Sequence, residues 1–443
     1  MILGPRVVIA GTHSGVGKTT VATGLMAALC RRGTRVAAAK VGPDYIDPGY
    51  HALATGRPPR NLDAWMCGEA AIPGLAARAA DGCDLLVVEG VMGLFDGAAG
   101  TGGRMVASTA HVAVLLRAPV ILVVDAAAMS GSVAALVHGF VTYDADVEVA
   151  GVVLNRVASD RHEAMLRLAL EPLGVPVLGV LHRDPGLIWR DRHLGLVPVV
   201  EHPDEIRRSL DHLATRIAAG CDLGAIERMA RSAPALTAEA PALPRRVAGA
   251  GVPVAVAAGP AFSFTYPDNA EALEAAGAEL IPFDPMSAPG LPGGIRGLVA
   301  GGGFPEVHAA PLAANQPLLD DVRRHVAAGL TTWAECGGLL WLSRGVDGIP
   351  MAGALPCDGR MTDRLTLGYR RVTTSTASPL GPAGTTLRGH EFHYSVAEPP
   401  GDGLDPVGGY LSPSLAASYV HLHLGASPEV AEHFVAAAAG IVP

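Results

Sequence analysis

The chain has 443 residues, 49% of them hydrophobic and 17% charged, so it is long enough for two hydrophobic cores and has the composition of a folded enzyme. A net charge of -9 and only 5% aromatic residues argue against nucleic acid as a main partner. No apolar run reaches membrane length and no signal peptide is evident, so we expect a soluble, cytoplasmic protein that does not bind membranes. The six cysteines include no close pair, which argues against a zinc site or a disulfide framework.

Short apolar runs alternate with alanine-rich helical stretches in the first half of the chain. The runs cover residues 7–10, 35–39, 84–88, 120–124, 149–154, 177–180 and 194–197. This alternation predicts a parallel sheet with helices on both faces. Ligands of such sheets bind beyond the carboxyl ends of the strands, so the polar residues that follow these runs are the candidate site.

Residues 11–20, with the sequence GTHSGVGKTT, separate the first apolar run from a helix-forming run. A strand, a glycine-rich turn and a helix form the setting of a phosphate-binding loop, in which backbone N–H groups and the helix N-terminus face phosphate oxygens. Thr12 stands where the usual pattern has glycine. In this loop Lys18 would reach the outer phosphates and the hydroxyl of Thr19 would bind Mg²⁺. The candidate nucleotide-binding residues here are Gly15, Gly17, Lys18, Thr19 and Thr20.

The basic residues are almost all arginine, and Lys18 and Lys40 are the only two lysines. Lysine is a compact charge on a flexible stem, whereas arginine is a planar fork. Both lysines follow predicted strands, so we interpret Lys40 as a second phosphate or substrate contact. The alternative for Lys40 is a solvated strand end.

Carboxylates follow the second and third predicted strands. Asp44 and Asp47, with Tyr45 between them, lie in a loop framed by prolines, and we expect this loop to face the nucleotide loop and the substrate. Glu89 directly follows the third strand, where a ligand of Mg²⁺ is expected, and Asp96, in the loop after it, is a candidate substrate contact.

The predicted metal ligands are therefore Thr19, Asp44 and Glu89. A different role is predicted for Asn155, which follows the fifth strand and is placed to bind the edge of the adenine ring. Any one of these acids alone would equally well cap a helix or a turn. Their grouping at strand ends favours a site.

Residues 232–251 are rich in proline and small residues, which predicts an extended linker between domains 1–231 and 252–443. A new α/β pattern follows, with predicted strands at 252–257 and 297–300. In the stretch 330–340 a strand leads to Cys336, which is flanked by small residues, and a helix follows. This is the arrangement of a nucleophile elbow, in which the nearby helix N-terminus is expected to lower the thiol pKa.

A nucleophilic thiol needs a base, and residues 418–423 offer His421 and His423. Residues two apart in a strand face the same side, so either histidine would reach Cys336. Gly302 and Gly303 are candidate donors for an oxyanion hole. The polar and aromatic stretch 388–394 either lines a pocket or stabilises a strand.

The whole chain resembles the cobyrinate (or hydrogenobyrinate) a,c-diamide synthase family. The resemblance rests on residues 42–48, 61–66, 89–97 and 192–198, and in the second half on 301–306, 334–338, 367–370 and 388–395. It implies a P-loop-type, dethiobiotin synthetase-like domain with a parallel sheet, followed by a class I glutamine amidotransferase α/β domain. The implied activity is ATP-, Mg²⁺- and glutamine-dependent amidation of corrinoid carboxylates through acyl phosphates, in a possible homodimer.

The chain departs from related families at three places. His13 replaces the signature lysine of MinD-like ATPases, and Gly259-Pro260 replaces an expected aspartate. No glutamate lies two residues after His421 or His423, so we expect a Cys–His dyad rather than a triad. Three alternatives stay open: cobyric acid synthase, nickel-sirohydrochlorin a,c-diamide synthase, and a regulatory P-loop ATPase with a vestigial amidotransferase domain.

Overall fold

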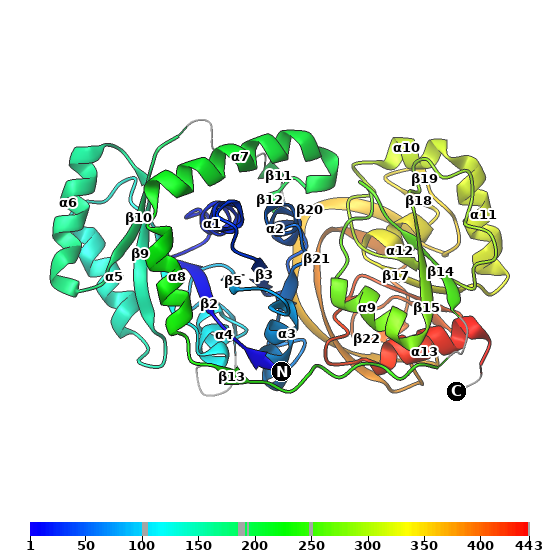
Figure 1. Cartoon of the computed structure of the whole chain (residues 1–443). Helices are drawn as coiled ribbons and strands as arrows, with labels where there is room; N and C mark the ends of the chain where they lie inside the picture. The colour runs from blue at the N-terminus through cyan, green and yellow to red at the C-terminus, as the bar shows by residue number, and fades with distance from the viewer. Residues whose placement is uncertain (100–104, 185–190, 193–194, 248–250, 442–443) are drawn as a thin grey trace. The chain divides into compact units, whose positions relative to one another are not determined.

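The computed structural model describes residues 1–99, 105–184, 191–192, 195–247 and 251–441. These residues belong to two compact units, Met1–Pro241 and Ala242–Pro443 (Figure 1). The boundary falls inside the stretch 232–251 that the sequence marks as a linker, of which residues 248–250 lie outside the described part. The beginning of that stretch belongs to the first unit, because β13 (Leu236–Thr237) pairs antiparallel with β1 (Ile2–Leu3).

The first unit is built on a seven-stranded sheet in which every neighbouring pair is parallel. In spatial order its strands are β10 (Val177–His182), β9 (Val149–Val157), β8 (Val120–Asp125), β2 (Arg6–Gly11), β5 (Leu85–Glu89), β3 (Val36–Val41) and β4 (Arg60–Leu62). The six strands predicted between residues 7 and 180 are confirmed. Their near-continuous burial explains why apolar runs identified them.

The seventh predicted strand, 194–197, is wrong as a member of this sheet. Leu194 lies outside the described residues, as does His193 of the motif at 192–198, and β12 (Gly195–Leu196) pairs antiparallel with β11 (Asp191–Arg192) in a separate sheet. The actual seventh strand, β4, has three residues, two of them polar, which is too short to show a pattern. A further two-stranded sheet joins β6 (Ala98–Ala99) to β7 (Met105–Val106).

Helices cover both faces of this sheet (Figure 1). The connections from β2 to β3 and from β5 to β8 run in opposite directions across it, and since such crossovers are right-handed, α1 and α4 lie on opposite faces. The α-helices of the unit are α1 (Lys18–Arg31), α2 (Ile46–Thr55), α3 (Ile72–Ala79), α4 (Thr109–Leu116), α5 (Ser132–Thr142), α6 (Asp160–Leu170), α7 (Pro203–Gly220) and α8 (Leu223–Ser232).

The core on the α1 face is formed by apolar side chains of the strands, α1, α7 and α8. Val7 and Ile9 of β2 alternate with residues that face the other layer, so they meet Leu25 of α1 and Leu213 of α7 in one buried cluster. Gly24 allows α1 and α7 to approach closely, because a Cβ there would lie 2.6 Å from Cγ1 of Ile217. This packing holds the helix that begins at the glycine-rich loop.

The second unit has a six-stranded sheet that is parallel except at its edge strand β23. In order its strands are β15 (Ala278–Phe283), β14 (Val252–Ala257), β16 (Gly297–Ala300), β17 (Thr331–Glu335), β24 (Leu415–Ser418) and β23 (Tyr410–Ser412). The predicted strands at 252–257 and 297–300 and the strand before Cys336 are confirmed. Its α-helices are α9 (Pro267–Ala276), α10 (Ala309–Ala314), α11 (Gln316–Ala327), α12 (Gly337–Leu342) and α13 (Glu429–Ala439).

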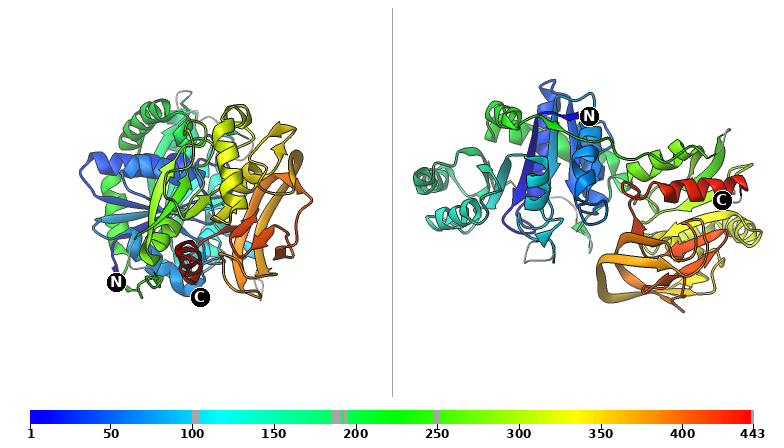
Figure 2. Two further views of the ribbon diagram at one scale, coloured as in Figure 1. Left: turned by 90° about the vertical axis from the view of Figure 1, so that its right-hand side faces the viewer. Right: turned by 90° about the horizontal axis from the view of Figure 1, so that it is seen from below.

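A second, mostly antiparallel sheet completes this unit. Its strands are β19 (Ile349–Pro350), β18 (Gly345–Val346), β20 (Asp358–Thr374), β21 (Thr386–Glu398), β25 (His421–Leu422) and β22 (Leu404–Asp405). Figure 2 shows the two long strands β20 and β21, in orange, running side by side. The register pairs His390 of β21 with His421 of β25, so this sheet brings the predicted polar cluster 388–394 to a predicted catalytic histidine. No helix in the described part of the chain is both long and apolar enough to span a bilayer.

Candidate functional site

The glycine-rich loop of the first unit connects β2 to α1, as predicted. Gly15 and Gly17 have φ angles of 80° and 96°, which favour glycine. A Cβ at Gly17 would also lie 2.3 Å from Nδ2 of Asn155. Asn155 donates from Nδ2 to the carbonyl of Val16 at 2.8 Å, so its amide supports the loop; its predicted contact with adenine stays a prediction.

Lys18 is the first residue of α1, and Thr19 and Thr20 follow it in the first turn. Its Nζ donates to the carbonyl of His13 at 3.1 Å. Burial and the nearby charge of Lys40 lower the pKa of Lys18 to about 8, although the carboxylates of Glu89, Asp47 and Asp96 act in the opposite sense. A buried ammonium with no ion pair among the described residues is suited to an anionic ligand.

Thr19 faces two carboxylates. Its Oγ1 donates to Oε1 of Glu89 at 2.6 Å and lies 3.2 Å from Oδ2 of Asp47. Glu89 is fully buried, and its other oxygen, Oε2, lies 2.6 Å from Nε2 of His51. Burial favours the protonated form of Glu89, but the charge of Lys40 and the hydrogen bond of His51 outweigh it and lower its pKa.

Lys40 is 3% exposed, so its interpretation as a solvated strand end is wrong. Its Nζ donates to Asp47 at 2.5 Å, to Glu89 at 2.9 Å and to the carbonyl of Gly90 at 3.1 Å. Burial disfavours the charged amine, but the charges of Asp47 and Glu89 outweigh it and raise the pKa of Lys40. These three bonds use its three N–H groups, so in this conformation Lys40 holds the carboxylates, and its contact with a phosphate or substrate stays a prediction.

Asp44 and Asp96 have structural partners. Oδ1 of Asp44 accepts the N–H groups of Ile46 at 2.7 Å and Asp47 at 3.0 Å, which caps the start of α2 just after the half-buried Tyr45. Oδ2 of Asp96 accepts the N–H of Gly93 at 2.8 Å. The cap, which is the alternative that the sequence left open for such acids, is therefore present at Asp44.

The oxygen donors near Thr19 fit Mg²⁺, a hard cation that protein sites hold through one or two carboxylates together with phosphate oxygens. The hydroxyl of Thr19 and the carboxylate of Glu89 are already 2.6 Å apart. In the part of the chain that the structure describes, no group of three or more His, Cys, Asp or Glu side chains is arranged to hold a metal alone. Such a site would therefore depend on a bound phosphate for its remaining ligands.

Sequence reasoning missed His51, which is fully buried beside Glu89. It lies four residues after Asp47 on α2, and this spacing places both side chains on one helix face. The four-residue spacing between Asp47 and His51 is the feature of the sequence that could have identified this histidine.

In the second unit, Cys336 lies between the end of β17 and the start of α12. Its φ of 48° and ψ of -96° are strained for a residue with a side chain, as expected of a nucleophile elbow. Gly338 is required two residues later, because a Cβ there would lie 2.1 Å from the carbonyl oxygen of Ala300. The predicted strand, turn and helix are confirmed.

The expected lowering of the thiol pKa is wrong for this structure. Burial, followed by the charge of Glu306, raises the pKa of Cys336, and Glu335 and Glu391 act in the same sense, whereas the N–H of Gly337 opposes it only in part. The thiol is therefore protonated at neutral pH and needs a base to remove its proton.

His421 and His423 do not occupy equivalent places, because β25 ends at Leu422 and the strand argument does not extend to His423. Nδ1 of His421 lies 3.4 Å from Oε2 of Glu335, the residue before the nucleophile. The ring of His423 instead packs on Tyr266, with centroids 4.6 Å apart, and its Nε2 lies 3.7 Å from Asp268.

The two glycines expected to form an oxyanion hole also differ. Gly302 donates its N–H to the carbonyl of Phe264 at 3.2 Å, so in this conformation it is not available to an oxyanion, contrary to the expectation. Its Cα lies against the His421 ring, since a Cβ there would be 3.3 Å from Nε2. The backbone nitrogen of Gly303 lies near Gly337, whose Cβ would be 3.0 Å from it, and its role as an oxyanion donor stays a prediction.

Part of the stretch 388–394 lies beside His421, because β21 pairs with β25. The rings of His390 and His421 stack with centroids 5.0 Å apart, and burial together with the charges of His421 and His423 lowers the pKa of His390 well below its usual value. Glu391 pairs with Arg370 at 2.5 Å. Of the two interpretations from the sequence, the strand is present, because all of these residues belong to β21, and a pocket lining stays a prediction.

Comparison with known proteins covers both units. Residues 7–196 match the CbiA family, described as CobQ/CobB/MinD/ParA nucleotide binding domain, and residues 253–429 match a CobB/CobQ-like glutamine amidotransferase domain. Hydrogenobyrinate a,c-diamide synthase of Streptomyces coelicolor is 51% identical, over 97% of each chain. The protein of that name from Thermobifida fusca is 48% identical, over 98% of this chain and 96% of the relative. Cobyrinate a,c-diamide synthase of Synechococcus is 42% identical, over 97% of each chain.

These matches confirm the two fold types expected from the sequence, a P-loop domain and a glutamine amidotransferase domain, in the expected order. The identities exceed 40% over nearly the whole of each chain, and the matched ranges contain Lys18, Cys336 and His421. The chain belongs to the cobyrinate and hydrogenobyrinate a,c-diamide synthase family, amide-forming ligases that use glutamine.

Proposed function

We propose that this protein uses ATP and glutamine to amidate the a- and c-acetate carboxylates of cobyrinic or hydrogenobyrinic acid through acyl phosphates. One observation carries the proposal: a phosphate-binding loop with a buried carboxylate–lysine network and a cysteine elbow with a histidine occur in one chain, which aligns along its length with relatives named for this reaction. One unit would activate the carboxylate and the other would release ammonia.

In the first unit, an oxygen of the substrate carboxylate bonds to the γ-phosphorus of ATP and ADP leaves. Ammonia then bonds to the acyl carbon and inorganic phosphate leaves, which forms the amide. Phosphoryl transfer depends mainly on positioning and on neutralising charge. Lys18 is suited to the outer phosphates because it is buried and has no ion pair among the described residues.

We further propose that Thr19 and Glu89 hold Mg²⁺, with Asp47 or Asp44 beside them. When bound, this ion neutralises phosphate charge. Lys40 and His51 keep Glu89 ionised and fixed in the absence of ligands, through contacts of 2.9 Å and 2.6 Å.

In the second unit, His421 takes the thiol proton of Cys336, and the sulfur attacks the side-chain amide carbon of glutamine. Ammonia leaves with the proton that His421 returns, and water hydrolyses the glutamyl thioester. Gly303 would donate to the oxyanion. His423, held by Tyr266 and Asp268, is not required as the base in this scheme.

Replacing Cys336 tests this division. Cys336→Ala should eliminate glutamine-dependent amidation and leave amidation with ammonium salt within about twofold of the parent, because the thiol only releases ammonia. Lys18→Ala should eliminate amidation with either nitrogen source while hydrolysis of glutamine partly survives. Mass spectrometry of products from cobyrinic and hydrogenobyrinic acid would measure both and identify the preferred ring. Loss of ammonium-dependent amidation in folded Cys336→Ala would contradict the proposal.

A further inference from the structure

In the second unit, the carboxylate of Glu335 contacts His421, the candidate base, at its Nδ1 atom. Oε2 of Glu335 lies 3.4 Å from Nδ1 of His421, and Oε1 accepts the N–H of Leu422 at 3.0 Å. The carboxylate therefore contacts the ring of one residue and the backbone of the next. Such a two-point contact fixes the carboxylate relative to β25, which carries the histidine.

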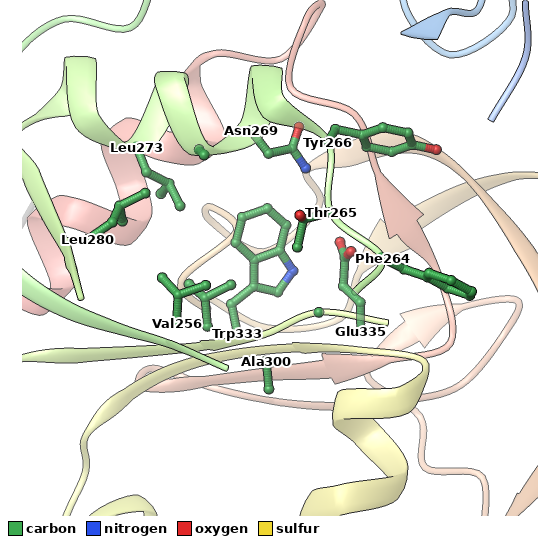
Figure 3. A pocket seen from close by; sticks show the side chains of 13 residues that line it. Val256, Phe264, Thr265, Tyr266, Asn269, Leu273, Leu280, Ala300, Trp333 and Glu335 are labelled. Atoms are coloured by element: carbon green, nitrogen blue, oxygen red, sulfur yellow. The ribbon is translucent and has the colours of Figure 1, made fainter. Parts of the chain in front are cut away.

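The surroundings of Glu335 make its charge effective. Its side chain is 9% exposed and lies beside a cavity of about 80 Å³ that is lined mainly by apolar side chains. Figure 3 shows the carboxylate pointing into this cavity near Trp333 and Thr265. Water screens a charge weakly in such surroundings, so the carboxylate acts strongly on a group in contact with it.

The charge of Glu335 is not committed to another cation. Among the ion pairs of the described residues, its only partner is His421. Glu391, another acid near Cys336, differs because it pairs with Arg370 at 2.5 Å. His390, stacked on His421, has a pKa far below its usual value because of burial and the charges of His421 and His423, so at neutral pH it adds no opposing charge.

We propose that Glu335 is a positioning residue that completes a Cys336–His421–Glu335 triad, a proposal that rests on the amidotransferase function proposed above. The carboxylate keeps the proton of neutral His421 on Nδ1, so that Nε2, which lies near Gly302, carries the lone pair that accepts the thiol proton of Cys336. It then stabilises the imidazolium that forms.

In this triad the acid comes from the residue directly before the nucleophile. The alternation of side chains along β17 makes this possible. Glu335 extends from the last position of the strand, and the backbone turns sharply at Cys336 with a φ of 48°, so the two adjacent side chains leave the backbone in different directions. The expectation of a simple dyad followed from the missing glutamate two residues after each histidine, and the structure supplies the carboxylate from another strand.

The decisive variant is Glu335→Gln, because it keeps the size and an oxygen that can accept the N–H of Leu422. Its amide nitrogen would donate to Nδ1, which moves the histidine proton to Nε2, where it blocks uptake of the thiol proton. We expect kcat for glutamine hydrolysis to fall by about 10²- to 10⁴-fold, with the KM for glutamine within about threefold. Amidation with ammonium salt should stay within about twofold, since Glu335 takes no part in that step.

A double-mutant cycle separates positioning from structural support. In the His421→Ala background, Glu335→Gln should cost less than about threefold in glutamine hydrolysis, because its effect acts through the histidine. If the fold-losses in glutamine hydrolysis caused by the two single changes multiply in the double variant, the proposal is overturned. Should Glu335→Gln not fold, Glu335→Asp, which keeps the charge but shortens its reach, serves in the same cycle and is expected to lower kcat by a smaller factor.

Asp321→Asn is a matched control. Asp321 accepts the N–H of Leu291 at 2.9 Å and lies 3.1 Å from Nδ1 of His325, so on α11 it makes the same two kinds of contact, together with an ion pair to Arg324 at 2.7 Å. This variant should leave glutamine-dependent amidation within about twofold of the parent. If Glu335→Gln is equally neutral while Cys336→Ala and His421→Ala are inactive with glutamine, only the triad is wrong. If Cys336→Ala keeps glutamine-dependent activity, the proposed function itself fails.

Discussion

Lys18, at the start of α1, and Lys40, in β3, are in opposite electrostatic situations. Lys40 bonds to two carboxylates, whereas the nearby carboxylates act on Lys18 without an ion pair among the described residues. Because burial is poorly compensated at Lys18, its pKa is lowered to about 8. The lowered pKa of Lys18 predicts that nucleotide binding depends on pH.

We expect nucleotide binding to take up a proton at Lys18 above about pH 8. Phosphate oxygens favour the ammonium form, so the pKa of Lys18 rises when a nucleotide binds, and the amine that is partly neutral without ligand becomes charged. Affinity should consequently decrease as the pH rises through about 8, the pKa of the free protein.

Calorimetric titration of ATP with Mg²⁺ in buffers of different ionisation enthalpy measures this uptake directly. Lys18→Arg is the control, because arginine stays charged throughout this range and should remove the contribution. Equal proton uptake in parent and variant would assign the proton to another group.

At the residue scale, sequence reasoning identified the residues suited to the chemistry better than it identified their hydrogen-bond partners. Glu89 ends β5 and Cys336 directly follows β17, as predicted, and Lys18 and Thr19 begin α1 after the predicted glycine-rich loop. Asp44 makes the helix cap that the sequence left open as an alternative, whereas Gly302 differs from expectation because its N–H binds the carbonyl of Phe264, a residue 38 positions earlier. Likewise, the contact of Glu335 with His421 joins residues 86 apart in the chain, and only the pairing of β17, β24 and β25 with their neighbours creates it.

At the scale of elements, apolar runs predicted the buried central strands of the two parallel sheets. They missed the longest strands, β20 and β21, because much of β20 is exposed and neither strand is a continuous apolar run, and they missed several short strands. β4 has three residues, and β25 has two, so neither contains enough positions for an apolar pattern. The order of strands depends on which strands hydrogen-bond, and that information lies in contacts between distant segments. The sequence therefore predicts the parallel sheets and not the strand order within them.

The packing of α1 on α7 provides a test at this scale. Gly24→Ala places a methyl group 2.6 Å from Ile217 and 2.7 Å from Leu213, so the helices must separate. We expect the free energy of unfolding of the first unit to fall by about 1 to 3 kcal/mol. Chemical denaturation monitored by circular dichroism measures it.

Gly139→Ala is the matched control for this change. Gly139 also lies inside a helix, α5, but a Cβ there meets nothing within 4 Å. The same substitution should raise stability by about 0.5 to 1 kcal/mol, because alanine restricts the unfolded chain more than glycine does. Equal effects of the two substitutions would show that helix propensity, and not contact with α7, determines the result.

For the whole molecule, the division into two compact units predicts separable unfolding. We expect calorimetry to resolve two transitions, of which a non-hydrolysable ATP analogue with Mg²⁺ raises only one. At a ligand concentration 100 times Kd the stabilisation should be about 2.7 kcal/mol. Lys18→Ala should remove the shift, and so should Glu89→Gln or chelation of Mg²⁺, whereas Cys336→Ala should keep it. A shift of both transitions by the analogue would show that the units unfold together.

The placement of the two lysines has a consequence for labelling chemistry. Both are buried beside the glycine-rich loop, at 7% and 3% exposure, and every other basic side chain is arginine or histidine. Reagents that acylate or form imines with amines therefore find no lysine on the outer surface, and the lowered pKa makes Lys18 the more nucleophilic of the two. An amine-reactive nucleotide analogue that enters the loop would meet Lys18 as its only reactive side-chain amine, since Lys40 stays charged and bonded. Because the other basic residues are arginine and histidine, a single amine-reactive label can modify the nucleotide loop selectively at Lys18.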